Sequence, residues 1–350
     1  MNTLRSRIAI FIGAAAALAG VLGCAIINPG AAATGWLVGF VFWAQILIGS
    51  LSLLMIHRLT SGGWGEIIAP VVEPAATAIP LLVLFAVPVF VAIPALCPWA
   101  QHPLSVKPDV LSLYLNRPAF IVRSLVAFTG WTALAFLLPR VSGGGGQLLA
   151  ALGLVFHAVV ISSVSIDWYL SIAAPFTSSS FGASVAITSL VVALAWAALW
   201  MPPSEDDPAI GDIGALLLAT VLGITYIDFM AVLVIWYGDI PREESWFVAR
   251  DPLPWRALAV AAFALGAVIP VLALIQAQFR NRLRPLRAVG VITLIGIIAY
   301  DAYLIVPPTG AAALVPALLA IIGIGLIVIG VASVLARRPP SFARGPLNVR

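Results

Sequence analysis

Charged residues, and lysine above all, are scarce in this sequence. Asp, Glu, Lys and Arg together make up 9% of its 350 residues, whereas a soluble domain carries about 25%. Lys107 is the only lysine, and the arginines stand at the ends of apolar segments rather than in a patch interleaved with aromatic residues. These features exclude a soluble globular protein and argue against a nucleic acid as a partner.

Cysteine and histidine are equally rare. The two cysteines, Cys24 and Cys97, are too few for an iron–sulfur cluster or a structural zinc site, each of which needs about four ligands. His57 is expected at a helix end and His157 at mid-depth, which disfavours a haem held between two histidines. No metal site is expected, and no cofactor is expected to be bound by this chain.

Long apolar runs are what the sequence has in abundance, since 62% of its residues are hydrophobic. A helix needs about 20 apolar residues to cross a membrane. Ten such runs occur, at approximately 8–27, 35–57, 74–96, 118–138, 148–170, 182–201, 212–238, 255–277, 286–306 and 311–335. The sequence therefore predicts an all-α polytopic membrane protein, with residues 1–350 in a single integral membrane domain surrounded by lipid.

Lysine and arginine are distributed unequally between the two sides of this arrangement. With the N-terminus inside, the inner cations are Arg5, Arg7, Arg58, Arg140, Arg280, Arg282, Arg284, Arg287, Arg337, Arg338, Arg344 and Arg350. The outer cations are Lys107, Arg117, Arg242, Arg250 and Arg256. Because short loops rich in Lys and Arg stay in the cytoplasm, both termini are predicted to be cytoplasmic.

Ionisable residues within the apolar runs are the first candidates for a function. Each costs a few kcal/mol at membrane depth and is usually paired or functional. Read from the inner to the outer side, a proton path could use Glu66, Glu73, His157, Asp167, Asp228 and Asp301. The alternative is structural: Arg123 and Asp167 could form an ion pair, and His157 could be a hydrogen-bonded core residue.

Tryptophans near the ends of the runs, among them Trp168, Trp200 and Trp236, suggest the aromatic belt of a membrane protein. The outer stretch "IWYGDIPREESWF" (235–247) adds a burst of charge to such a belt. Its charged residues are Asp239, Arg242, Glu243 and Glu244, and an aromatic belt alone does not explain their order.

Four stretches together resemble a known family. "HRLTSGGWG" (57–65) and "DIGALLL" (212–218) match the loop after the second helix and the start of the seventh. "SIDWYLSIAAPFTSSSFG" (165–182) aligns without gaps with the family pattern S-V/I-D-W-x-M-S-L-E-P-H-W-x-S-T-x-x-G, and 235–247 resembles I-W-Y-G-N-L-P-E-E-T-S-W-Y. The chain thus resembles the second NrfD/polysulfide-reductase-like membrane subunit of alternative complex III.

The resemblance implies two four-helix bundles, helices 2–5 (about 35–170) and helices 6–9 (about 182–306), flanked by helices 1 and 10. It further implies a multi-subunit quinol-oxidising respiratory complex in the bacterial cytoplasmic (inner) membrane. In that complex, periplasmic iron–sulfur and haem c subunits carry the electrons and a quinone or quinol is the substrate. The membrane subunit itself has no redox centre and supplies a proton path. The resemblance of 235–247 also predicts a periplasmic docking edge for a partner subunit, formed by Asp239, Arg242, Glu243 and Glu244.

The chain departs from the family pattern at the outer end of the fifth helix. Ala173, Ala174, Pro175 and Phe176 replace Glu-Pro-His-Trp, so a carboxylate and an imidazole are missing. Asp228 replaces a small polar residue and Arg242 an acidic one. The chain is therefore expected to be a divergent member.

Two other functions remain open at this point. One is a structural anchor without proton conduction, with the polar groups held in ion pairs. The other is a secondary transporter, because the proline-containing segment "PVVEPAATAIP" (70–80) is of the kind that interrupts helices at binding sites. No matching broken segment is evident in the second half of the sequence.

Overall fold

The computed structural model describes residues 2–101, 108–174, 176–202 and 208–336, with side chains omitted for 2–7 and 242. Within these ranges the chain forms helices and no strands. Among the described residues, nine helices are long and apolar enough to cross a membrane, and a bent pair of helices brings the number to ten. The chain is a multi-pass helical membrane protein, as the ten apolar runs predict. Lys107, Pro175 and the arginines after residue 336 lie outside the described residues.

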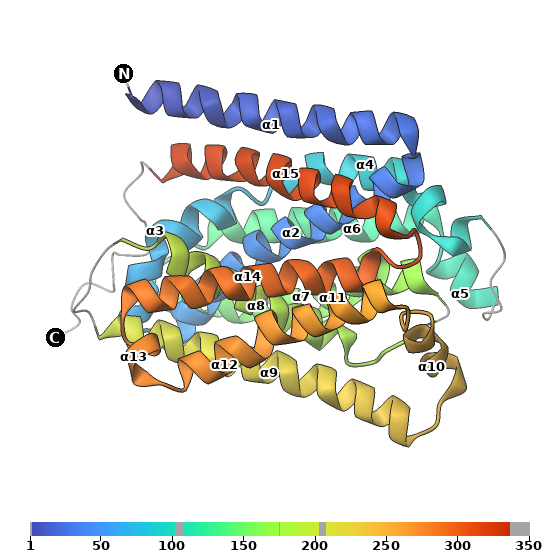
Figure 1. Cartoon of the computed structure of the whole chain (residues 1–350). Coiled ribbons are helices and arrows are strands. Elements are labelled where there is room, and N and C mark those ends of the chain that lie inside the picture. The colour runs from blue at the N-terminus through green and yellow to red at the C-terminus, as the bar shows by residue number, and fades with distance from the viewer. Residues whose placement is uncertain (1, 102–107, 175, 203–207, 337–350) are drawn as a thin grey trace.

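The long helices lie roughly along one common direction and cross the molecule back and forth, from side to side in Figure 1. They are α1 (Asn2–Ile27), α2 (Pro29–Thr60), α3 (Gly63–Thr77), α4 (Leu81–Leu96), α6 (Arg117–Leu137), α7 (Gly143–Trp168), α8 (Phe181–Trp200), α9 (Ala209–Tyr237), α11 (Leu253–Phe263), α12 (Ile269–Leu274), α14 (Leu283–Ile305) and α15 (Leu314–Leu335). Short elements connect them: η1 (Pro98–Ala100), α5 (Pro108–Leu113), η2 (Leu170–Ala173), α10 (Pro241–Val248), α13 (Ala277–Arg280) and η4 (Ala311–Ala313). A π-helical segment, η3 (Ala264–Val268), joins α11 to α12.

Two helix starts are set by asparagine followed by proline. The side chain of Asn28 accepts a hydrogen bond from the Ala31 amide at 3.0 Å. Asn116 accepts one from the Ala119 amide at 2.9 Å. Each asparagine satisfies one of the free amides of a first helical turn, and the proline next in the chain or one residue further has no amide to satisfy. These caps fix where α2 and α6 begin.

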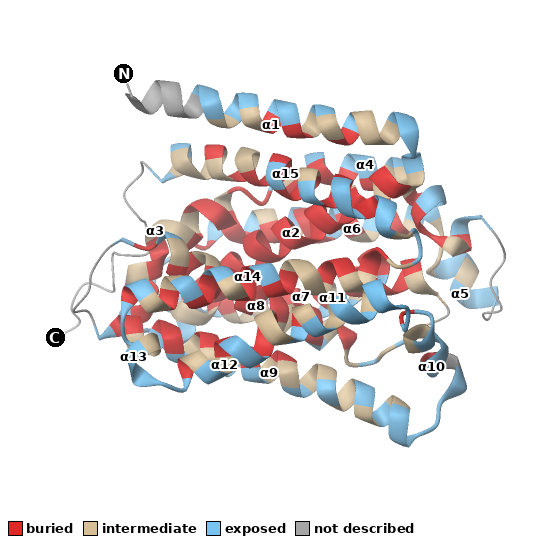
Figure 2. Cartoon of the chain, viewed as in Figure 1, coloured by how far each residue is buried: buried red, intermediate tan, exposed pale blue. Residues whose placement is uncertain are grey.

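Helix α2 is the central helix of the molecule, and its membrane-spanning window is entirely buried. Figure 2 shows this buried centre beside the more exposed α1 and α9. Helices α1 and α15 pack against each other, and both contact α2. Trp43 on α2 donates from Nε1 to the Ile321 carbonyl of α15 at 2.8 Å. The two peripheral helices therefore lie together on one side of α2 rather than on opposite sides of the bundles.

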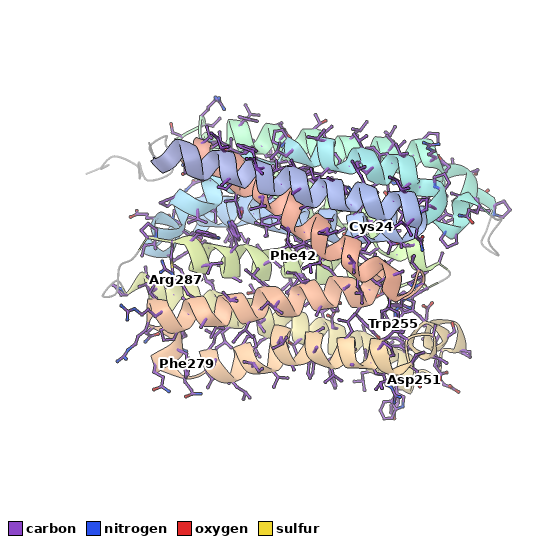
Figure 3. All side chains as sticks on the ribbon, turned by 45° about the horizontal axis from the view of Figure 1, so that its top comes forward. Cys24, Phe42, Asp251, Trp255, Phe279 and Arg287 are labelled. Carbon is purple, nitrogen blue, oxygen red and sulfur yellow. The ribbon has the colours of Figure 1, made fainter. Side chains whose placement is uncertain are left out.

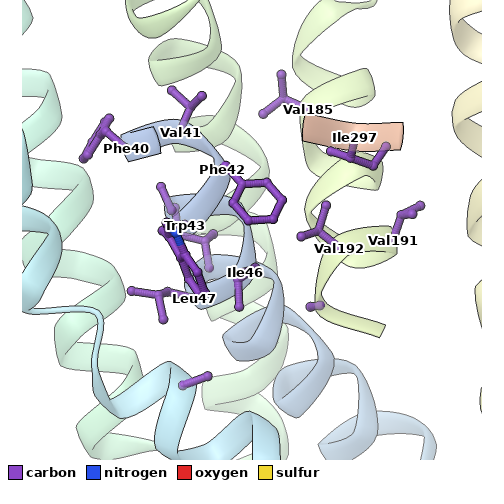
Figure 4. Close-up of a cluster of buried hydrophobic side chains, with 14 of the residues drawn as sticks. Phe40, Val41, Phe42, Trp43, Ile46, Leu47, Val185, Val191, Val192 and Ile297 are labelled. Carbon is purple, nitrogen blue, oxygen red and sulfur yellow. The ribbon is translucent and has the colours of Figure 1, made fainter. Parts of the chain in front are cut away.

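The first half of the chain (about 35–170) and the second half (about 182–306) meet where α2 packs against α8. A Cβ atom at Gly49 would overlap the carbonyl oxygen of Ser189, so the two backbones approach as closely as small residues allow. Figure 4 shows Phe42 and Ile46 on α2 directed toward Val185 and Val192 on α8. Helices α2 and α8 therefore form a closely packed, apolar seam between the halves.

The third span differs from its predicted form. It starts at Gly63, about three helical turns before the predicted start at residue 74, and it bends by 48° between α3 and α4. Pro70 and Pro74 lie inside α3, and Pro80 precedes α4, so backbone hydrogen bonds are missing around the bend. The second half has an irregularity of its own, η3, which the sequence did not reveal.

The belt assignment is wrong for Trp168. This side chain is 4% exposed, whereas Trp200 and Trp236 are 54% and 76% exposed, as expected of an interfacial belt. The Trp168 ring packs 5.0 Å from Phe40, centroid to centroid. A position near the end of a helix fixes the depth of a residue but not the neighbour that its side chain faces.

The arginine-rich end of the second half is separated from its acidic end along the helix axes. In Figure 3, Arg287 and Phe279 lie toward one end, and Asp251 and Trp255 lie toward the other. Arg287 donates from Nη2 to the Met201 carbonyl at 2.7 Å, and Arg58 similarly binds the Val141 carbonyl. These arginines tie together helix ends on one face, the face predicted to be cytoplasmic.

Candidate functional site

A buried polar cluster lies between the two halves. The Gln45 side-chain amide on α2 donates to the Tyr169 hydroxyl at 2.6 Å and to Asp301 Oδ1 at 3.0 Å. The Tyr169 hydroxyl also donates to Asp301 Oδ1 at 3.4 Å. Gln45, Tyr169 and Asp301 are 4%, 5% and 1% exposed. A carboxylate on α14 is thus held by two donors from the first half of the chain.

Local structure explains how Tyr169 reaches this cluster. Helix α7 ends at Trp168, and Tyr169 leaves the helical conformation with φ −125° and ψ −61°. Its ring is then turned against Phe181 of α8, with centroids 5.6 Å apart. The family-like segment 165–182 therefore delivers a hydroxyl group to the contact between the halves.

The cluster borders a small cavity of about 10 Å³, lined in part by Gln45, Tyr169 and Ser189. Gln45 Oε1 is buried and has no hydrogen-bond partner among the described residues. A volume of this size corresponds to about one water-sized sphere. The arrangement therefore has room for one solvent molecule beside a free acceptor.

A second carboxylate group joins the cluster through α14. Asp228 on α9 accepts a hydrogen bond from the Ser184 hydroxyl of α8 at 2.8 Å. It also accepts one from the Tyr300 hydroxyl. Because Tyr300 precedes Asp301 in the chain, the two carboxylates lie on either side of the same turn of α14. We call Gln45, Tyr169, Ser184, Asp228, Tyr300 and Asp301 the central polar cluster.

Arg123 and Asp167 form a separate, bidentate ion pair. Arg123 Nη2 lies 2.7 Å from Asp167 Oδ1, and Arg123 Nε lies 2.8 Å from Oδ2. Arg123 also donates to the Tyr114 carbonyl at 2.9 Å and lies 3.7 Å from the centre of the Tyr114 ring. Burial, followed by the nearby Asp167 carboxylate, raises the pKa of the Tyr114 phenol to about 12. Every donor to this carboxylate among the described residues belongs to Arg123, which fits a structural pair.

The remaining proton-path candidates do not join the central polar cluster. His157 is buried on α7, its Nδ1 has no partner among the described residues, and its ring centroid lies 6.0 Å from that of Trp131. Glu66 is exposed and Glu73 half-buried, both on α3. Of the six candidates, the structure brings together Asp228 and Asp301.

The charged stretch after α9 folds back on the segment after α7. Glu243 on α10 is 8% exposed, and its carboxylate accepts hydrogen bonds from the Thr177 amide at 2.9 Å and the Thr177 hydroxyl at 2.8 Å. The Trp246 ring stacks on Phe176 with centroids 4.7 Å apart. Two of the family-like stretches, 165–182 and 235–247, are therefore in direct contact.

This contact alters the predicted docking edge. Glu243 is turned inward and engaged by Thr177, so its charge is not free for a partner. Asp239 and Glu244 are exposed, and Asp239 has a positive φ of 45°. The side chain of Arg242 lies outside the described residues. The exposed part of the edge is formed by Asp239 and Glu244.

Arg250 is an organising residue that the sequence indicated only as an outer cation. It is 5% exposed, and its guanidinium lies 3.6 Å from the centre of the Trp246 ring. It donates to the carbonyls of Trp246 and Leu304, both at 3.1 Å. Burial lowers the pKa of Arg250 to about 10. The cation complements the carbonyl ends of α10 and α14.

Gln45, Tyr169, Ser184 and Tyr300 are the members of the cluster that the sequence did not indicate. All four are uncharged, and the search for candidates followed charged residues at membrane depth. A glutamine inside a long apolar run was the available signal for Gln45, because an amide in hydrocarbon also needs a partner.

No family model matches the chain, and no curated protein matches it. Among the described residues, no three His, Cys, Asp or Glu side chains gather in a way that could hold a metal ion. Fold and cluster together define a multi-pass helical membrane protein with one carboxylate, Asp301, at the contact between its halves and a second, Asp228, within the second half.

Proposed function

We propose that this chain is the integral membrane subunit of a quinol-oxidising respiratory electron-transfer complex in the bacterial cytoplasmic membrane. Its termini face the cytoplasm, and its outer face anchors periplasmic iron–sulfur and haem c subunits. The contact between segments 165–182 and 235–247 supports this assignment, because two of the stretches that resemble alternative complex III form one outer surface.

The observation that carries the functional part of the proposal is the central polar cluster. Carboxylates within a membrane are costly and are usually retained for function or pairing. Asp228 and Asp301 have no cationic partner within ion-pair distance among the described residues, whereas Asp167 is paired with Arg123. We therefore assign proton transfer to Asp228 and Asp301, linked by Tyr300, and a structural role to Asp167.

Replacing Asp301 with Asn in the purified complex tests this assignment. The change keeps the shape and the Gln45 contact but removes the titratable carboxyl group. We expect quinol oxidation coupled to proton release to fall by about 100-fold, the scale of a lost positioned proton carrier. Asp251→Asn is the matched control, because Asp251 is an exposed acid in a loose pair with Arg256 at 3.6 Å. Unchanged proton release in Asp301→Asn would leave the subunit as an anchor only.

Secondary transport is the second candidate, favoured by the 48° bend between α3 and α4 and by the π-helical segment in the second half. Interrupted helices build binding sites in transporters. Purification of the native protein under mild conditions separates the candidates. A respiratory subunit brings haem and iron–sulfur proteins with it, whereas a transporter is recovered alone.

A further inference from the structure

A cavity of about 280 Å³ opens beside Asp228, between α9, α11, η3 and α14. The cavity has room because its wall on the α11 and η3 side is formed by small residues: Ala259, Ala262, Gly266 and Ala267. A π-helical turn often marks a functional site within a helix. Here η3 brings Gly266 so close to Gly296 of α14 that a side chain at Gly296 would collide with its backbone.

The cavity opens toward lipid rather than toward water. Phe229 and Phe263 at its rim are 61% and 58% exposed, and Val232 is 47% exposed. A molecule that enters here must therefore be soluble in the membrane. An apolar cavity of about 150 Å³ suffices for benzene, so this one has space for a substituted ring.

The polar groups of the cavity restrict the chemistry of its ligand. Asp228, Thr225, Tyr300 and Tyr303 line the wall, and Asp228 is the only Asp, Glu, Lys, Arg or His among the lining residues. An anionic phosphate headgroup would meet a carboxylate without a compensating cation. The carboxylate accepts from Ser184 and Tyr300, and its two oxygens have about four acceptor positions in all. It can therefore accept a further hydrogen bond from a ligand hydroxyl.

We propose that this cavity binds the ring of a neutral, hydroxyl-bearing, membrane-soluble aromatic molecule of the hydroquinone class. The ligand hydroxyl donates to Asp228, its ring lies among Phe229, Phe263 and Tyr300, and its apolar tail extends into lipid. The choice of a hydroquinone as the natural ligand rests on the proposed function; the cavity and its preference for a hydroxyl group do not.

Binding of 2-decyl-1,4-hydroquinone to the full chain in lipid nanodiscs, kept under reducing conditions, tests the proposal. The matched ligand is its dimethyl ether, which keeps the ring and tail but cannot donate a hydrogen bond. We expect saturable binding of the hydroquinone, and binding of the ether weaker by about 10- to 100-fold, the value of a hydrogen bond to a charged group. Equal binding of the two ligands, or no saturable binding, would overturn the proposal.

Two variants locate the binding without relying on the ligand pair. Ala259→Phe fills the cavity and leaves its polar groups in place, so it should abolish saturable binding. Leu222→Phe is the control, because Leu222 is an exposed residue of α9 outside the cavity. Unaltered hydroquinone binding in Ala259→Phe, with the protein still monodisperse, would assign the cavity to lipid chains. The assay needs no partner subunit, so its outcome is independent of whether haem and iron–sulfur proteins co-purify.

Discussion

Two carboxylates on neighbouring helices are accommodated in different surroundings. Asp301 is sealed between the halves by Gln45 and Tyr169, with 1% of its surface exposed. Asp228 is half-buried and borders the lipid-facing cavity. Tyr300, which precedes Asp301 on α14, lines the same cavity as Asp228. Asp228 can therefore be reached from the cavity, whereas Asp301 is not among the residues that line it.

Cys97 provides a residue-scale test of how tightly the outer end of the first half is packed. It is 3% exposed and lies 3.8 Å from the Ser171 hydroxyl. Burial raises the pKa of its thiol from 9.0 to about 12. The thiolate, which is the reactive form, should therefore stay scarce up to about pH 11 in the native protein.

The measurement is maleimide labelling of a Cys24→Ser variant between pH 7 and pH 10. We expect labelling to remain slow over this whole range, and to become fast and pH-dependent once the protein is denatured. Native labelling that rises tenfold per pH unit would show an accessible thiol with an ordinary pKa, contrary to the packing described above.

At the scale of elements, α10 is attached to the segment after α7 by the Glu243 carboxylate and by aromatic stacking. A double-mutant cycle with Glu243→Gln and Thr177→Val measures this attachment. We expect a coupling free energy of about 1–3 kcal/mol, typical of residues in one hydrogen-bond network. Thermal unfolding in detergent provides the measurement. Glu244→Gln, at an exposed neighbouring position, should show no coupling to Thr177, and equal coupling for both acids would contradict the inward orientation of Glu243.

The seam between α2 and α8 depends on Gly49. An alanine here would place its Cβ against the Ser189 carbonyl, and backbone cannot yield as a flexible side chain can. We expect Gly49→Ala to destabilise the protein by about 1–3 kcal/mol or more, the usual cost of overpacking. Gly23→Ala on α1 is the control, since a Cβ there meets nothing within 4 Å. It should be neutral or stabilising by about 0.5–1 kcal/mol, as judged by thermal unfolding midpoints.

Helix-scale features were predictable from the sequence where they depend on length and composition. Ten apolar runs yield ten spans because a membrane requires about 20 apolar residues for each. The bend between α3 and α4 has a local cause in its prolines, yet its angle depends on neighbouring helices. Apart from Pro270, nothing in the local sequence indicates the π-helical segment η3. Trp168 faces the core because of its neighbours rather than its depth.

Candidate site residues were predictable only as individuals. Asp228 and Asp301 stand out because charge is rare in the runs, but nothing in the sequence places Tyr300 between them or Gln45 opposite Asp301. These partners come from helices up to 256 residues apart in the chain. Only the packing of α2 and α8 against α14 brings them together.

At the scale of the whole molecule, the start of α1 and the end of α15 lie at one end, and α5 and α10 lie at the other (Figure 1). This follows from the even number of candidate spans in the described part of the chain, ten with the bent pair counted as one. The outer surface formed by α10, with Asp239 and Glu244 exposed, is then at the end predicted to face the periplasm. The proposed docking of partner subunits there depends on this orientation.

Cysteine labelling of intact cells tests the orientation. In a background with Cys24 and Cys97 replaced by serine, Glu244→Cys on α10 and Gln278→Cys on α13 place thiols at opposite ends, both at exposed positions. Because arginine-rich loops stay in the cytoplasm, a membrane-impermeant maleimide should label Glu244→Cys in intact cells. Gln278→Cys should be labelled only after the membrane is opened. The reverse pattern would show that the membrane orientation is inverted. Helix α10 would then lie in the cytoplasm, where no periplasmic subunit could bind it.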